Sequence, residues 1–270
     1  MRVLILCLIL CCAFKFPDKD GITNFDHPQQ VKNGVFVLTN PRSGSHLLLA
    51  SISCLTKRPI RGRVPMWHFV NDPPFRQTNN PLNLPVDFGK QTVYWGHEFH
   101  ILKHLNHSNN KLIFTFRDYK SNILSCLNVK YQFARSTNNL DIESLLKKEI
   151  LFGGTFFADY IKRLQLYDNW NPKYRLLIKF EDLVKQPKNF VPALLTHIDE
   201  ESDPTSFIAN YTEFKNLVRK HYDTKGTPTI SRNNTGYFNR YISPETHLLL
   251  DRHVQRKYPK LWQRYLCPTQ

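Results

Sequence analysis

The chain has 270 residues, of which 41% are hydrophobic and 13% aromatic, and its formal net charge is +15 at pH 7. This composition excludes a disordered or low-complexity chain, and the length suits one α/β domain with a sizeable core. The basic excess favours an anionic partner, but it does not choose among nucleic acid, an acidic lipid or polysaccharide, and a phosphorylated small molecule.

An apolar run covers residues 3–14, after one early arginine and before several charged residues. It is shorter than the roughly 20 residues that span a bilayer, and it has the length of a signal-peptide core without a clear small-residue cleavage site. Export or anchoring therefore stays open against a buried first strand or an overlong start. We expect residues 1–30 to be an N-terminal apolar segment and linker, and residues 31–268 to be a single domain.

Three of the six cysteines lie in that N-terminal segment. The other three, Cys54, Cys126 and Cys267, are widely spaced and odd in number. No disulfide framework and no paired Cys-x-x-Cys metal site follows from this spacing, so we expect reduced and mostly buried thiols.

Apolar runs bounded by chain breakers alternate with amphipathic helical patterns along the rest of the chain. This alternation is typical of β-α repeats, and it predicts a central parallel sheet covered by helices on both faces. Strands are predicted at residues 34–39, 91–96, 111–116 and 174–180. Helices are predicted at residues 45–55, after the second strand, from the third strand to 129, and at 142–170, 190–198, 212–220 and 243–256. The aperiodic stretches at residues 57–90 and 223–241 are predicted to be a functional loop or lid and a loop.

The first strand and first helix are joined by the turn in VFVLTNPRSGSHLLLAS, residues 35–51. Ligands of open parallel sheets lie beyond the carboxyl ends of the strands, where a helix N-terminus offers backbone N–H groups. Gly44 allows close approach of the backbone to an anion, Ser43 and Ser45 offer hydroxyls, and Arg42 adds a fixed charge. The turn lacks the nucleoside-triphosphatase signature. Alone, it fits either a phosphate site or an ordinary capped turn with a surface arginine.

Polar motifs also follow the other three predicted strands. V-Y-W-G-H ends at His97, R-D-Y-K-S-N-I-L-S runs from Arg117 to Ser125, and F-E-D-L-V-K-Q-P begins at Phe180. With the first turn, these motifs resemble in order the sulfotransferases that use 3′-phosphoadenosine 5′-phosphosulfate (PAPS). The resemblance covers residues 35–245. It implies a P-loop-like nucleotide-binding α/β fold and a sulfuryl transfer to a hydroxyl or amine of an acceptor by in-line displacement.

The resemblance also implies roles for the residues of the first and third motifs. Arg42 would reach the bridging oxygen on which charge builds as the bond breaks, because a cation there stabilises the transition state more than the ground state. Arg117 and Ser125 would bind the 3′-phosphate. The 5′-phosphate would be bound by Ser43, Gly44, Ser45 and His46.

Two segments nearer the C-terminus extend the resemblance. In Y-T-E-F-K, Thr212 would bind the nucleotide and Phe214 would stack on adenine, with a helix start that buries Phe214 in the core as the alternative. In S-R-N-N-T-G-Y-F, Arg232, Asn233 and Gly236 would close over the 3′-phosphate, with a surface turn as the alternative. Within the adenine pocket, Leu47 stands where Trp is usual, and Phe180 replaces the usual Tyr.

His97 is the candidate general base that removes the acceptor proton, because a neutral imidazole near pH 7 suits that task. His100, His104 and His107 follow at helix-like intervals and raise the alternative of a metal site. The pattern is not H-E-x-x-H, and histidines on one face of a polar helix are typical of a plain surface. We therefore expect no metal.

Two other classes of protein compete with this reading. A kinase-like phosphotransferase is disfavoured by the missing P-loop lysine, and a basic nucleic-acid or polyanion-binding module has no recognised fingerprint here. We expect a small-molecule or glycan acceptor and no nucleic acid, and the oligomeric state is not predicted. Cytosolic PAPS supply and free cysteines favour the cytoplasm, whereas residues 1–14 leave membrane association or export open.

Overall fold

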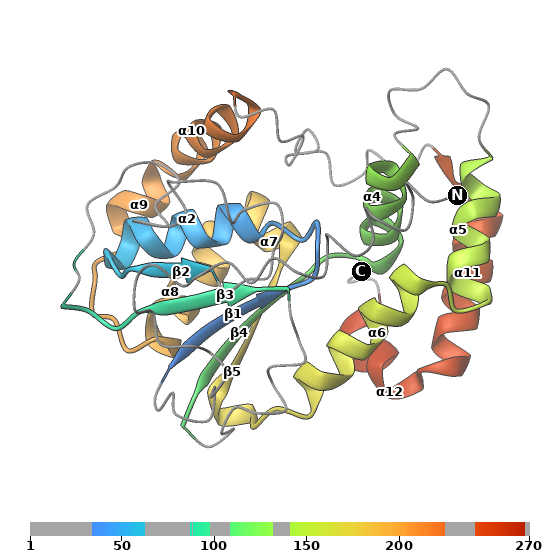
Figure 1. Cartoon of the computed structure of the whole chain (residues 1–270), viewed down its shortest axis with the longest axis horizontal. Helices are drawn as coiled ribbons and strands as arrows, with labels where there is room; N and C mark the ends of the chain where they lie inside the picture. Colours follow the sequence, from blue (N-terminus) through green and yellow to red (C-terminus); the bar gives the residue numbers. More distant parts are fainter. Residues whose placement is uncertain are drawn as a thin grey trace, which may run out of the picture.

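The computed structural model describes residues 34–62, 87, 89–97, 109–131, 141–224 and 241–267. Its centre is a five-stranded sheet in the order β2-β3-β1-β4-β5, and every adjacent pair of strands is parallel (Figure 1). The strands are β1 (Val35–Thr39), β2 (Ile60–Gly62), β3 (Val93–Gly96), β4 (Lys111–Phe116) and β5 (Arg175–Lys179). The predicted fold class, a central parallel sheet with helices on both faces, is confirmed.

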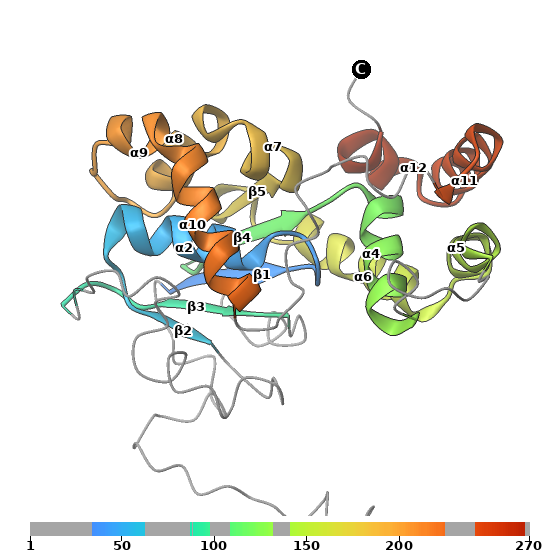
Figure 2. The same ribbon diagram turned by 90° about the horizontal axis from the view of Figure 1, so that it is seen from above.

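Helices cover both faces of the sheet (Figures 1 and 2). Within the described ranges they are α2 (Ser45–Thr56), α4 (Tyr119–Tyr131), α5 (Ile142–Leu151), α6 (Thr155–Asp168), η3 (Pro172–Tyr174), α7 (Phe180–Lys185), α8 (Pro187–His197), α9 (Thr205–Ala209), α10 (Tyr211–Thr224), α11 (Pro244–Lys257), α12 (Pro259–Leu261) and η5 (Trp262–Leu266). None of the helices in the described ranges is long and apolar enough to cross a bilayer.

The central strand β1 is buried along its whole length, which explains its unbroken apolar sequence. Val35 and Val37 point to one face and pack in a core with α2, α7, α8 and α10. Phe36 and Leu38 point to the other face and pack in a second core with α4, α5, α6 and α11. Side chains alternate across a strand, so one strand organises both cores.

Four strand predictions are confirmed, but one prediction at another position is wrong. The stretch at residues 57–90, predicted to be a loop or lid, contains the edge strand β2, which pairs with β3. A strand of three residues is too short to show an alternating pattern, and pairing with a neighbour forms it. The helical region predicted at residues 142–170 is confirmed, and it consists of two helices because Gly153 interrupts it with a φ of +69°.

Several predictions fall outside the described residues. These are the segment at residues 1–30, the rest of the proposed lid at 63–86, most of the helix after the second strand, and the loop at 225–240. The division into residues 1–30 and 31–268 stays a prediction.

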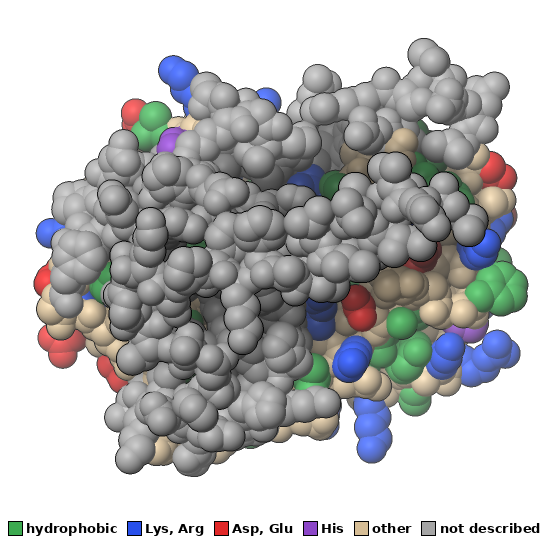
Figure 3. Space-filling model, viewed as in Figure 1, with side chains coloured by type: hydrophobic (Ala, Val, Ile, Leu, Met, Phe, Trp, Pro, Cys, Tyr) green, Lys and Arg blue, Asp and Glu red, His purple; other side chains and the backbone are tan. Residues whose placement is uncertain are grey.

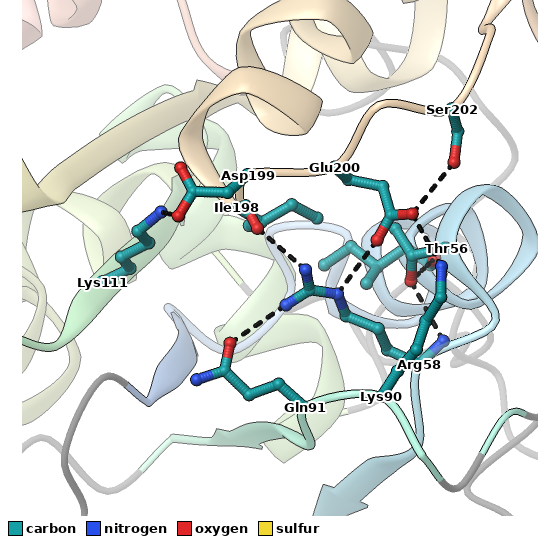
Figure 4. Close-up of polar contacts among 10 residues, drawn as sticks. Thr56, Arg58, Lys90, Gln91, Lys111, Ile198, Asp199, Glu200 and Ser202 are labelled. Atoms are coloured by element: carbon teal, nitrogen blue, oxygen red, sulfur yellow. Dashed lines mark hydrogen bonds and ion pairs between the residues drawn. The ribbon is translucent and has the colours of Figure 1, made fainter.

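A polar network holds the amino ends of the strands (Figure 4). Arg58 donates to Glu200, to the Gln91 side chain and to the Ile198 carbonyl at 2.9–3.2 Å, and Lys90 also pairs with Glu200. The network ties the end of α2 and the start of β3 to the connection after α8. It lies at the end of the sheet opposite the carboxyl ends of the strands, so it serves stability and leaves the other end for ligands.

Candidate functional site

The sheet register brings the predicted motifs together at one edge. Thr39 at the end of β1 aligns with Thr115 on β4, and Leu38 aligns with Gly96 on β3. His97 follows Gly96 directly and Arg117 follows Phe116, so both reach the carboxyl edge of the sheet beside the first loop. The three motifs that the sequence placed at strand ends therefore share one site.

Gly44 shapes the first loop. It caps the N-terminus of α2 with a φ of +86°, and a Cβ atom there would lie 2.9 Å from the Leu183 and Phe180 side chains. The first intrahelical bond runs from the Leu48 N–H to the Gly44 carbonyl. The backbone N–H groups of the first turn precede that bond, so the helix itself does not use them. The loop thus has the shape of an anion site at a helix N-terminus.

Hydrogen bonds of Ser43 hold this loop in its conformation. Its hydroxyl donates to the Asn40 carbonyl at 2.5 Å and lies 2.8 Å from the Thr115 hydroxyl, and its N–H also donates to the Asn40 carbonyl. The Asn122 side chain donates to the Pro41 carbonyl at 2.8 Å and fixes the loop to α4. These contacts build the loop, and a direct bond from Ser43 to a phosphate stays a prediction.

Arg42 joins the first motif to the third. Its Nε donates to the Ser125 hydroxyl at 3.1 Å, and its own backbone lies in the left-handed region with a φ of +69°. Burial lowers the pKa of Arg42, and it lowers the pKa of Arg117 as well, with the Arg42 charge acting in the same direction. Arginines keep their charge despite such shifts, so the half-buried Arg42 and the buried Arg117 place two cations close together in a region that favours an anion.

Arg117 is only 2% exposed, and two contacts hold it. The Tyr160 hydroxyl donates to its carbonyl at 2.9 Å, and its guanidinium lies over the Phe180 ring at 4.6 Å. The charges of Glu181 and Asp118 partly offset the effect of burial on its pKa. Phe180 contacts the Arg117 guanidinium and also lies close to Gly44, so the fourth motif packs against the first and third motifs.

His97 is oriented by Thr39. Its Nδ1 lies 2.8 Å from the Thr39 carbonyl and 3.0 Å from the Thr39 hydroxyl. A carbonyl only accepts, which places the proton on Nδ1 and the lone pair on Nε2. Burial lowers the pKa of His97 to about 4, so the ring is neutral at pH 7. The ring has the tautomer and charge state that a base requires.

His46 and Trp95 lie beside this histidine. The Trp95 ring is 5.9 Å from the His97 ring and 6.1 Å from the His46 ring, edge-on in both cases. Burial, helped by His97 and Arg42, lowers the pKa of His46 to about 3. His46 is therefore neutral, and it adds no charge to the arginine pair.

The segment predicted to bind adenine starts α10. Thr212 is exposed, whereas Phe214 is buried against Phe207 and Tyr211, with ring centroids 5.0 and 6.2 Å away. The Tyr211 hydroxyl donates to the Leu183 carbonyl and ties α10 to α7. Phe214 thus takes the core position named as its alternative, and adenine stacking stays a prediction. Arg232, Asn233 and Gly236 lie outside the described residues.

Three supporting residues were not predicted. Thr39 orients His97, Tyr160 holds Arg117, and Asn122 holds the loop at Pro41. Thr39 carried a weak signal as the polar last residue of a buried strand, whereas nothing in the sequence linked Tyr160 to a residue 43 positions away. In the described part of the chain, no three His, Cys, Asp or Glu residues form a group that could hold a metal. His100, His104 and His107 lie outside it.

Comparisons with known proteins point in one direction. The chain is similar to a mouse sulfotransferase complexed with PAP, with a TM-score of 0.56 and 12% identity over 87% of this chain and 90% of the other. It is also similar to retinol dehydratase in complex with androsterone and the inactive cofactor PAP, with a TM-score of 0.51 and 12% identity over 87% and 83%. Likenesses at this identity show the fold. No curated protein matches the chain. A model of the sulfotransferase domain matches residues 32–261, and the chain therefore belongs to the sulfotransferase domain family.

Proposed function

We propose that this sulfotransferase uses PAPS as its co-substrate and transfers the sulfuryl group to a hydroxyl or amine of an acceptor. The observation that carries the proposal is the contact between Arg42 and Ser125. One residue comes from the loop proposed for the 5′-phosphate and the other from the helix proposed for the 3′-phosphate. A nucleotide with phosphates on both positions would engage the two parts at once. The two similar structures were solved with PAP, adenosine 3′,5′-bisphosphate, which supports this nucleotide.

The proposed transfer is a single in-line displacement. The acceptor oxygen or nitrogen forms a bond to sulfur while the bond from sulfur to the bridging phosphate oxygen breaks, and PAP leaves. Arg42 stabilises the charge that grows on the leaving oxygen. His97 Nε2 takes the acceptor proton, because Nδ1 is held by Thr39. Because burial lowers the pKa of His97 to about 4, the imidazole is unprotonated at neutral pH and can accept a proton.

The acceptor class is proposed more broadly, as a small molecule or a glycan. Androsterone and retinol occupy solved structures of retinol dehydratase, which supports a small-molecule acceptor for this fold. The two regions expected to form the acceptor pocket, residues 57–90 and 135–157, are described only in part.

Titration with PAP tests the nucleotide, and a transfer screen tests the reaction. We expect PAP to raise the melting temperature by several degrees at saturation, and adenosine 5′-monophosphate to raise it less. No shift with PAP would overturn the proposal. ATP serves as the control for a kinase-like site, and a larger shift with ATP than with PAP would favour that alternative.

A PAPS transfer screen over phenols, alcohols, amines and glycans then identifies the acceptor by mass. With that acceptor, His97→Ala and His97→Gln should each lower kcat by about 10²–10⁴-fold and leave PAP affinity unchanged. Full turnover in either variant would remove the assignment of His97 as the base.

A further inference from the structure

The inner face of helix α11 packs against the rest of the domain. Leu250 and Val254 are buried in the core, and Asp251 accepts from both the Tyr119 hydroxyl and the Lys120 ammonium at 2.6 Å. The helix thereby packs on α4 and α5, at the end of the molecule away from α9 (Figures 1 and 2). These contacts fix the orientation of α11, so the residues on its opposite side face away from the core.

The outward side combines leucines with arginines. Leu248 and Leu249 are 58% and 47% exposed, and they are neighbours in the sequence. Arg252 and Arg256 are also exposed and follow Leu248 at intervals of four residues, so the three side chains lie in line along the helix. Leu249 lies beside them, three residues before Arg252. We call Leu248, Leu249, Arg252 and Arg256 the α11 outer face.

The charge on this face is unbalanced. Arg252 and Arg256 form no ion pair within the described residues, and Asp251 is turned inward to Lys120. Exposed Lys257, the last residue of α11, and Lys260 on α12 add positive charge near the end of the helix. Exposed Glu245 lies three and four residues before the leucines, on the same side of the helix, so one carboxylate stands against the two arginines. Figure 3 shows further Lys and Arg side chains at the lower right of the near face, and Figure 2 shows that α11 lies behind α5 in that view.

The cations at the end of α11 also act on a nearby histidine. Burial, together with Lys257 and Arg256, lowers the pKa of His253. The cations therefore act on a common region of the surface.

We propose that the α11 outer face docks on the surface of an anionic lipid bilayer. The leucines enter the headgroup region, and the arginines lie against lipid phosphates and carboxylates, which is how basic amphipathic surfaces bind such membranes. An acidic polysaccharide would satisfy the arginines but leave both leucines in water. A second copy of the chain would bring two basic faces together, and each copy carries a net charge of +15.

Vesicle sedimentation with the full chain tests the proposal. We expect binding to phosphatidylcholine vesicles that contain roughly one third phosphatidylserine, weaker binding to phosphatidylcholine alone, and a loss of binding as salt is raised. Leu248→Ser with Leu249→Ser should weaken partitioning about tenfold. Arg252→Glu with Arg256→Glu should weaken it by about tenfold or more.

Matched variants elsewhere separate this face from general charge and hydrophobicity. Leu217→Ser removes a leucine that is 52% exposed on α10, and Lys173→Glu with Lys188→Glu reverses two exposed cations on other elements. Both controls should keep most of the binding to anionic vesicles. An unchanged melting temperature in every variant confirms that the fold is intact.

Four results would overturn the proposal. The first is an absence of binding to anionic vesicles, and the second is an equal loss of vesicle binding in the α11 and control variants. The third is a loss of vesicle binding in the arginine variant with no change in the leucine variant. The fourth is a dimer, detected by light scattering, that dissociates in the leucine variant. The third result would indicate a polyanion site without insertion, and heparin retention would then identify it. The fourth would assign the face to a second copy of the chain.

Discussion

The Nε of Arg42 donates to the Ser125 hydroxyl at 3.1 Å, across 83 positions of the sequence. The first loop and helix α4 are therefore connected at the site through a cation. The Asn122 side chain supports the same connection by donating to the Pro41 carbonyl. A ligand that binds the first loop would therefore also affect α4. The contact connects Ser125, proposed to bind the 3′-phosphate, with Arg42, proposed to stabilise the leaving oxygen.

Arg42→Ala should lower kcat by about 10²–10³-fold, because it removes the cation proposed to face the leaving oxygen. Ser125→Ala should mainly weaken PAP binding. The two changes should not be additive in kcat/KM, with a coupling of about 0.5–3 kcal/mol, because the side chains are in direct contact. Steady-state kinetics and PAP titration of both single variants and the double variant check this. Additive effects would show that the contact is incidental.

Gly44→Ala should destabilise the protein by about 1–3 kcal/mol and abolish most of the PAP-induced thermal shift. A Cβ atom at this position is strained by the φ of +86° and lies 2.9 Å from the Leu183 and Phe180 side chains. Gly153→Ala is the matched control, since its φ is +69° but nothing lies within 4 Å of the added atom. It should cost only the backbone strain, about 1 kcal/mol, and leave PAP binding unchanged. Equal effects of the two changes on PAP binding would contradict a role for close packing at Gly44.

The meeting of the candidate site residues at one edge of the sheet could be predicted from the ends of the strands. His97 and Arg117 could be placed there because each follows a buried apolar run, and parallel strands bring such residues to one edge. Strand β1 was predicted for the same reason, since a run buried on both faces reads as continuously apolar. The apolar pattern of a segment and the order of the motifs along the chain can be read from the sequence without knowledge of the packing.

The residues that hold the site in place could not be predicted in this way. Tyr160 binds the Arg117 carbonyl from a distant helix, and Phe180 lies under the Arg117 guanidinium as an ordinary aromatic residue. The direction of the Ser43 hydroxyl, toward Asn40 and Thr115, is equally invisible in a loop motif. Such contacts depend on how distant segments pack, and several residue types would serve at each position.

Arg117→Gln should remove the preference for PAP over adenosine 5′-monophosphate, because Arg117 is proposed to bind the phosphate that only PAP carries. We expect PAP affinity to fall about 10²-fold, while the affinity for the monophosphate changes little. Isothermal titration with both nucleotides measures the ratio. Arg175→Gln is the control, since Arg175 donates to the Tyr167 carbonyl at the far end of the sheet. It should lower stability without changing the ratio, and a retained preference in Arg117→Gln would reject the 3′-phosphate assignment.

Acid should destabilise the protein through the two histidines of the site. Burial lowers the pKa of His46 to about 3 and that of His97 to about 4, below the ordinary value of about 6.5. The unfolded chain therefore binds more protons than the folded chain between about pH 6.5 and pH 4, so stability falls as the pH drops through that window and is level above it.

Each histidine should contribute at most about 2 kcal/mol of this loss by pH 5. Urea unfolding at pH 7 and pH 5 measures it. His46→Gln should recover part of the difference, because the replacement does not titrate, and an identical pH dependence in this variant would show that His46 takes up no proton on unfolding. The same pKa of His97 means that the proposed base stays neutral down to about pH 4. The value of kcat should therefore show no loss of a basic group between pH 8 and pH 5.5, although an ordinary histidine would titrate there at about 6.5.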